Sequence, residues 1–233
     1  MKKNCLFVVK IITVFVLITF GLGISDCASA AGIFYSVNMR YDAAKAVIPA
    51  YLKAEGKALN AVISVAEFID TRQVDDKKEI GRVRERDDTR NPVYPKDVTQ
   101  TKAVADGIKA YLKKAGYKVA DPIVQWDLKE GTMPKGSGKI IIGGNIEELE
   151  VTCWRGVFSH AYKTSLKLTI IFADVATGKI IYKSKVESSS SKDDVSFSEE
   201  QLGGQLSTAL GDAIEKVFKD KDVAQKLKEV LNR

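Results

Sequence analysis

Cys153 and His160 are the residues of this chain whose types could perform nucleophilic catalysis. A cysteine becomes a nucleophile when a base such as histidine takes its proton, and His160 is the only histidine among 233 residues. Seven residues separate the two, on neighbouring predicted strand ends, so a catalytic dyad is one hypothesis. However, Cys153 continues the apolar alternation of Leu149 and Val151, which is typical of a buried, unreactive thiol. We therefore expect a structural cysteine and no enzymatic activity.

Carboxylates and glycines just before Cys153 are the next candidates for chemistry. Glu148 and Glu150 share one face of a predicted strand, but no distant acid or aromatic sugar platform completes a glycosidase, so a strand edge protected by charge is the simpler interpretation. One histidine and one cysteine beyond residue 30 are too few for a zinc site. Gly143-Gly144 lacks the Gly-Lys-Ser/Thr ending of a phosphate loop and is interpreted as a bulge or sharp bend. We expect no metal and no cofactor.

The connection from Trp154 to Tyr162 is the strongest candidate for binding. Large apolar groups are unusual in a loop, and Trp and Arg are enriched at the centres of protein interfaces. We predict a partner-binding site at Trp154, Arg155 and Phe158. The alternative is that Trp154 and Phe158 fold back to cover the end of the sheet, since tryptophan suits both places.

The first thirty residues have the pattern of a signal peptide. A short positive start precedes an apolar run from Cys5 to Ile24, and Ala28-Ser29-Ala30 supplies the small residues that signal peptidase reads, so cleavage is predicted between Ala30 and Ala31. The uncharged part of the run is shorter than the ~20 residues that span a bilayer. We expect residues 1–30 to be removed and the remainder to be exported to the periplasm or to the periplasmic face of the outer membrane.

Lipid attachment at Cys27 is the alternative processing route. Ile24-Ser25-Asp26-Cys27 has the apolar, small and cysteine residues in the required order. Asp26, however, occupies the position where Gly, Ala or Ser normally precedes the cysteine. Both routes stay open from the sequence, with membrane association as a possible consequence.

The charge of the exported part is nearly balanced. Removal of residues 1–30 leaves 33 basic and 29 acidic side chains, spread along the chain. This balance favours solubility and a mild attraction to anionic surfaces, and it argues against binding of nucleic acid.

Hydrophobic periodicity predicts one α+β domain at 31–233, an α/β sandwich in which a mixed, mainly antiparallel sheet packs against amphipathic helices. A strand at 59–69, a helix at 97–115 and a strand at 117–126 form a short βαβ-like step. Alternating strands follow at 139–153, 166–172 and 180–187, the last two joined by a Thr177-Gly178 turn. After a polar bridge at 188–194, Ser198 has the spacing of a helix N-cap before two amphipathic helices that end at Leu231.

The segment from Asp70 to Asp97 differs in composition from the rest. Sixteen of its 28 residues are charged, with both signs interleaved. Such a segment buries little surface, so we predict a long charged loop or ribbon at 70–97 that contacts the domain at Ile80-Gly81. It lacks the ligand pattern of an EF-hand calcium loop.

Several of these features together resemble a known family over roughly residues 58–231. They are Phe68-Ile69-Asp70-Thr71-Arg72, the Ile80-Gly81 step, Ala115-Gly116-Tyr117-Lys118-Val119, the turn at 174–179 and the closing helix. In this order they resemble the YajG-like family of bacterial envelope lipoproteins. The resemblance implies an α/β domain facing the periplasm, often anchored by lipid and without an established enzymatic activity. Asp26 departs from the lipidation signal of that family.

Two classes of function follow. The first is a non-enzymatic accessory or binding module of the cell envelope that recruits an envelope protein through the Trp154 loop or the charged loop. The second is a periplasmic carrier or sensor of a small apolar or anionic ligand held between helices and sheet. A closed apolar cavity would favour the second class.

Overall fold

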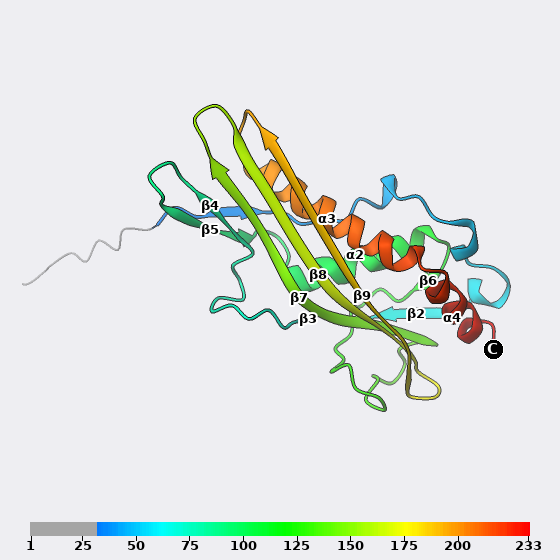
Figure 1. The fold of residues 1–233 in the computed structure, drawn as a ribbon. Coiled ribbons are helices and arrows are strands. Elements are labelled where there is room, and N and C mark those ends of the chain that lie inside the picture. Colours follow the sequence, from blue (N-terminus) through cyan, green and yellow to red (C-terminus); the bar gives the residue numbers. More distant parts are fainter. Residues whose placement is uncertain (1–31) are drawn as a thin grey trace, which may run out of the picture. The chain divides into compact units, whose positions relative to one another are not determined.

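Three long strands form the centre of the sheet. β7 (Ile140–Arg155), β8 (His160–Asp174) and β9 (Lys179–Asp194) pair antiparallel in sequence order. They stand side by side in Figure 1. The turn between β8 and β9 contains Gly178 at φ +68°, a conformation that glycine adopts without a steric penalty. The predicted Thr177-Gly178 turn is therefore confirmed.

The computed structural model describes residues 32–233. Within them, residues 33–233 form one compact unit. The predicted signal peptide, the cleavage between Ala30 and Ala31, and Cys27 lie outside the described residues.

Short strands extend the sheet from the other edge of β7. β2 (Val62–Val65), β3 (Ile69–Asp70) and β4 (Gly81–Arg84) pair parallel with successive parts of β7. Beyond them, β6 (Lys118–Val119) pairs parallel with β2, as the βαβ-like step requires. The remaining two strands are β5 (Arg90–Pro95), antiparallel to β4, and β1 (Tyr35–Val37), parallel to β5.

Helices pack against this mixed sheet, so the predicted α+β class is confirmed. α3 (Glu199–Lys219) contacts β7, β8 and β9, while α2 (Gln100–Lys114) lies against β2 and β6 and α4 (Lys221–Leu231) follows α3 (Figure 1). Ser198 is the N-cap of α3: the Gln201 backbone N–H donates to its Oγ at 3.2 Å, as predicted. Leucine, isoleucine and valine side chains from these helices and from the sheet form the main buried core.

A second, smaller core lies on the other face at the lower end of β7 and β8. Trp126 and Ile141 are buried there with Ala66, Ile171 and Ala173. The Trp126 indole N–H donates to the backbone oxygen of Lys129 at 3.1 Å, which satisfies its polar atom. Trp126 is therefore a core residue, in contrast to Trp154.

The segment at 70–97, predicted as a long charged loop, contains regular secondary structure. It contains β4 and β5, which form an antiparallel hairpin inside the sheet, and Val83 and Val93 are fully buried beneath it. On β4, Arg82 and Arg84 flank Val83, so these charged side chains reach solvent while the backbone pairs. The prediction that this segment contacts the domain at Ile80-Gly81 is correct but incomplete.

The interpretation of Gly143-Gly144 as a bulge is wrong. The β7–β8 register is continuous there and shifts between Ile146 and Glu148 instead. The two glycines serve close packing: a Cβ on Gly144 would lie 2.0 Å from the backbone oxygen of Thr169.

Three predicted boundaries also differ. Ser188 to Asp194, predicted as a polar bridge, continues β9, because pairing with β8 needs only backbone groups. The sequence favours Asp97 as the N-cap of the helix at 97–115, but the N-cap of α2 is Thr99, and Asp97 forms an ion pair with Arg40 at 2.6 Å. Ala43 to Leu52 looks helical from its apolar spacing, with a break at Pro49, but the structure has only two short 3₁₀ turns there, η1 (Ala43–Lys45) and η2 (Ala50–Leu52). A third, η3 (Gly56–Leu59), precedes β2.

Candidate interaction surface

One face of the upper sheet, here called the open face, carries polar and aromatic side chains pointing away from α3. On β7, Leu149, Val151 and Cys153 are buried on the helix side, so the alternate residues face the other way. The open face is formed by the outward residues of β4, β5, β7, β8 and β9, namely Arg82, Arg84, Arg90, Glu148, Glu150, Thr152, Trp154, Ala161, Lys163, Ser165, Ser189 and Ser191.

Trp154 lies near the upper end of this face, and 56% of its surface is exposed. Its cross-strand neighbours are Arg84 on β4 and Ala161 on β8. The small side chain of Ala161 leaves one flank of the indole uncovered. A tryptophan held on a rigid strand loses little conformational freedom on binding, which suits it to anchor a partner.

A shallow hollow of about 400 Å³ surrounds Trp154 and is rich in cations. Arg84 forms an ion pair with Asp88 at 2.7 Å, and Arg82 pairs with Glu79. Arg90 and Lys163 line the same hollow, and neither forms an ion pair within residues 32–233. The surroundings of the indole therefore favour an acidic or polar group.

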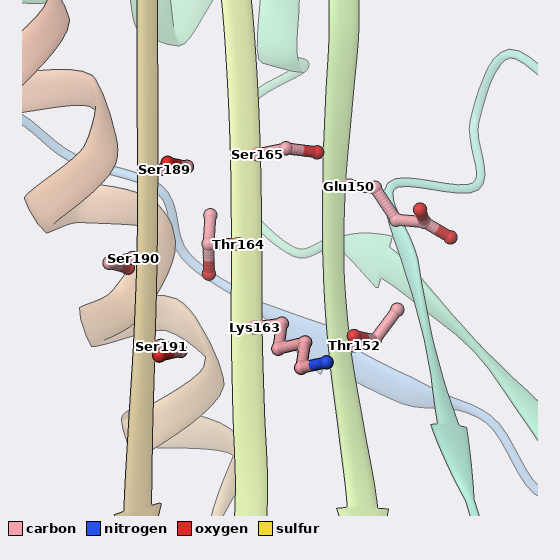
Figure 2. A pocket seen from close by; sticks show the side chains of 8 residues that line it. All are labelled: Glu150, Thr152, Lys163, Thr164, Ser165, Ser189, Ser190 and Ser191. Atoms are coloured by element: carbon pink, nitrogen blue, oxygen red, sulfur yellow. The ribbon is translucent and has the colours of Figure 1, made fainter.

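Hydroxyl groups dominate the neighbouring part of the open face. A second hollow, of about 500 Å³, spans β7, β8 and β9 between Glu150 and the serine run at 189–191. Figure 2 shows the Lys163 amine reaching toward β7 beside Thr152, with small hydroxyl side chains on the adjacent strands. Ser189 and Ser191 are exposed, and their short side chains leave hydrogen-bonding groups accessible there. Ser190 instead donates to Gln205 of α3 at 3.2 Å, and Thr164 is buried.

Arg155 does not share the surface with Trp154. Its guanidinium forms an ion pair with Glu85 at 3.0 Å and lies 4.7 Å from the centre of the Phe197 ring. Glu85 also accepts a hydrogen bond from the Tyr35 hydroxyl at 2.8 Å. These contacts connect β7 to the β4–β5 hairpin and to β1. Arg155 therefore holds these strands together and does not contribute to the open face.

Phe158 lies at the tip of the β7–β8 hairpin, away from the hollow around Trp154. It is 91% exposed. The alternative in which Trp154 and Phe158 fold back over the sheet end is therefore wrong. A partner-binding role for these residues stays a prediction, and the structure does not bring Trp154, Arg155 and Phe158 together in one surface.

The cysteine is unsuited to catalysis. Cys153 is buried on the helix side of β7, and burial raises the pKa of its thiol to about 11. Its cross-strand neighbour is Tyr162, whereas His160 pairs with Arg155. An inaccessible and protonated thiol cannot act as a nucleophile near neutral pH.

Metal-binding side chains are also not clustered. Within residues 32–233, no group of three or more His, Cys, Asp or Glu residues is arranged to hold a metal ion. Glu148 and Glu150 do share the open face, as predicted, and their cross-strand neighbours on β8 are Lys167 and Ser165.

Arg82, Arg84 and Arg90 are the surface residues that sequence reasoning missed. The sequence predicts a loop at their positions, and only pairing of β4 with β7 brings them beside Trp154. The signal that could have identified them is the alternation Arg82-Val83-Arg84, which has the two-residue period of a strand.

The fold and this surface define an α+β domain with an open sheet face, and the comparison with known families adds its class. The chain belongs to a lipoprotein family, since the family model described as "Uncharacterized lipoprotein" matches residues 54–228. Lipoproteins are exported, so this is an exported protein of the cell envelope. A search of curated proteins found no match. Among residues 32–233, none of the helices combines the length and apolar composition needed to cross a bilayer.

A solved structure of a bacterial protein shares the fold at low sequence identity. A protein from Xanthomonas campestris is 10% identical with a TM-score of 0.52, over 84% of this chain and 99% of that chain. A lipoprotein from Neisseria meningitidis (13% identical, TM-score 0.36, 67% and 99% covered) and a minor lipoprotein from Acinetobacter baumannii (11%, 0.35, 64% and 94%) also align. The first similarity supports the fold, and the two lower scores carry no argument.

Proposed function

We propose that this protein is a non-enzymatic accessory protein that binds another envelope protein through the open face around Trp154. The observation that carries the proposal is the half-exposed tryptophan on a rigid strand, surrounded by arginines and a lysine. Aromatic residues and arginine are enriched at the cores of protein interfaces. The buried, protonated Cys153 supports the non-enzymatic part of the proposal.

The proposal includes a location in the periplasm or at the periplasmic face of the outer membrane. It also includes the finer assignment to the YajG-like family, supported by the order of the motifs between about residues 58 and 231. The carrier or sensor function is not favoured by a specific observation, because the two hollows on the open face are open to solvent.

Site-specific photo-crosslinking in cells that export the chain tests this function. A photoreactive amino acid replaces Lys163, which is exposed beside Trp154 on the open face. The matched control replaces Lys113, an exposed lysine on α2. We expect a discrete protein adduct from position 163, none from position 113, and loss of the adduct when Trp154→Ala is added.

Three outcomes would contradict the proposal. They are the same adducts from both positions, an adduct that persists with Trp154→Ala, and no adduct from position 163. In the last case, a small molecule retained by the purified protein in native mass spectrometry would support the carrier function instead.

A further inference from the structure

Exposed apolar side chains gather at the end of the sheet that carries the β7–β8 hairpin tip. Val157 and Phe158 form this tip, and they are 66% and 91% exposed. Val195, 83% exposed, directly follows β9, whose last residue, Asp194, pairs with His160 next to the same tip. These three side chains lie outside both cores and outside the hollow around Trp154.

Direct contacts hold several segments together at this end. An Arg86 guanidinium N–H donates to the backbone oxygen of Gly156 at 3.2 Å, which joins the β4–β5 turn to the β7–β8 tip. Phe197 packs edge-on against the rings of Tyr35 and His160, at 5.1 and 6.1 Å between centroids. The arrangement is therefore a connected end of the domain and not a set of independent loops.

The chain also enters the domain at this end. Exposed Ile33 and Phe34 immediately precede β1, and Phe34 packs against Tyr94 of the neighbouring strand at 6.1 Å between ring centres. At ~3.6 Å per extended residue, the six residues from Cys27 to Ile33 span at most about 22 Å. A lipid on Cys27 would thus hold the start of β1, which belongs to this end of the domain, within about 22 Å of the bilayer surface.

Charges near the tip are balanced. Residues 82–90 and 192–194 together carry five basic and five acidic side chains. Attraction to anionic headgroups therefore contributes little here, and burial of apolar surface in the interfacial region would dominate.

We infer that this end is a membrane-docking surface, in which Val157 and Phe158 enter the interfacial region of a lipid bilayer. Val195, Ile33 and Phe34 lie around them. This inference is independent of the proposed protein partner, because the docking surface does not include Trp154. With the tip in the membrane, the open face lies at an angle to the bilayer and remains accessible to a protein partner.

Lipid quenching of a fluorophore at the tip tests the inference. The chain starting at Ala31 is tethered by an N-terminal hexahistidine to vesicles of phosphatidylcholine with a nickel-chelating lipid and an acyl-chain nitroxide lipid. A bimane is attached at Ser159→Cys, which retains Val157 and Phe158. The matched control carries the bimane at Val47→Cys, a 74% exposed site between η1 and η2. Native Cys153 is buried and does not compete for the label.

We expect quenching at position 159 to exceed that at position 47 by at least three-fold. Adding phosphatidylglycerol or 0.5 M salt should leave the quenching at position 159 unchanged. The double change Val157→Ser and Phe158→Ser should reduce quenching to the level of position 47, whereas Trp154→Ala should leave it unchanged. Quenching at position 159 that equals the control, or that persists in the double serine variant, would overturn the inference. Circular dichroism of each labelled chain verifies that it is folded.

Discussion

Replacing Arg72 tests how the charged segment after β3 is attached to the domain. The Arg72 guanidinium is buried and forms an ion pair with Asp70 at 2.7 Å. It also donates to the backbone oxygens of Lys77, Glu79 and Leu149 at 2.6, 2.8 and 3.1 Å. One side chain therefore connects β3, the turn before β4 and the middle of β7.

The magnitude follows from what Arg72→Met leaves behind. Methionine retains most of the apolar stem, so the loss is mainly that of the ion pair and its hydrogen bonds. Removing one partner of a buried ion pair costs ~3–5 kcal/mol. Asp70 keeps a hydrogen bond from Gln100 at 2.9 Å, and Lys77 lies 3.9 Å away, which places the expected cost near the lower limit. For a domain of this size, ~3 kcal/mol lowers Tm by about 6–12 °C.

Urea denaturation followed by circular dichroism measures this cost. The control is Arg82→Met, which breaks an exposed ion pair with Glu79 and should cost below ~1 kcal/mol. The double variant Asp70→Ala/Arg72→Met should be less destabilised than the sum of its two single changes, by ~1–3 kcal/mol. If Arg72→Met costs no more than Arg82→Met, the reasoning about the buried pair is refuted.

The same cluster gives a pH dependence with a definite sign. Burial alone would raise the pKa of Asp70, but hydrogen bonds from Arg72 and Gln100 outweigh it and hold the pKa below its ordinary value of 3.8. The folded protein therefore binds fewer protons than the unfolded chain, and stability falls as the pH drops through the folded pKa. The stability difference between the native chain and Asp70→Ala should shrink below about pH 4.

Further predictions concern α3 and Cys153. In α3, Gly204→Ala should stabilise the protein by about 0.5–1 kcal/mol, because nothing lies within 4 Å of the new Cβ. The adjacent Gly203→Ala should destabilise it in the same denaturation assay, since its Cβ would lie 2.6 Å from the backbone oxygen of Asn38. Cys153 should react with a thiol reagent at pH 8 at least a hundred-fold faster in unfolded than in native protein; equal rates would show that the thiol is accessible. Ser198→Ala removes the N-cap of α3 and should cost about 1 kcal/mol, and an unchanged urea midpoint would contradict the role of this cap.

Local patterns in the sequence were sufficient for the elements whose apolar residues recur at a regular period. Leu166 to Phe172 alternates with a period of two, and α3 shows a helical stripe behind the Ser198 cap, so both were predicted correctly. The burial of Cys153 followed from the same alternation. In each case, the side chains themselves record which side faces the core.

Tertiary structure alone decided the composition of the surface around Trp154. Strand pairing uses backbone N–H and C=O groups that every non-proline residue carries. The charge-rich segment 81–95 and the serines 188–191 can therefore join a sheet with little apolar patterning. The parallel pairing of β4 with β7 then places Arg84 beside Trp154, 70 residues away in the chain. Likewise, Arg155 follows Trp154 directly, yet the pleat turns it to the opposite face, toward Glu85. The sequence thus determined which residues are apolar and periodic, whereas backbone pairing between distant segments determined which charges surround the exposed tryptophan.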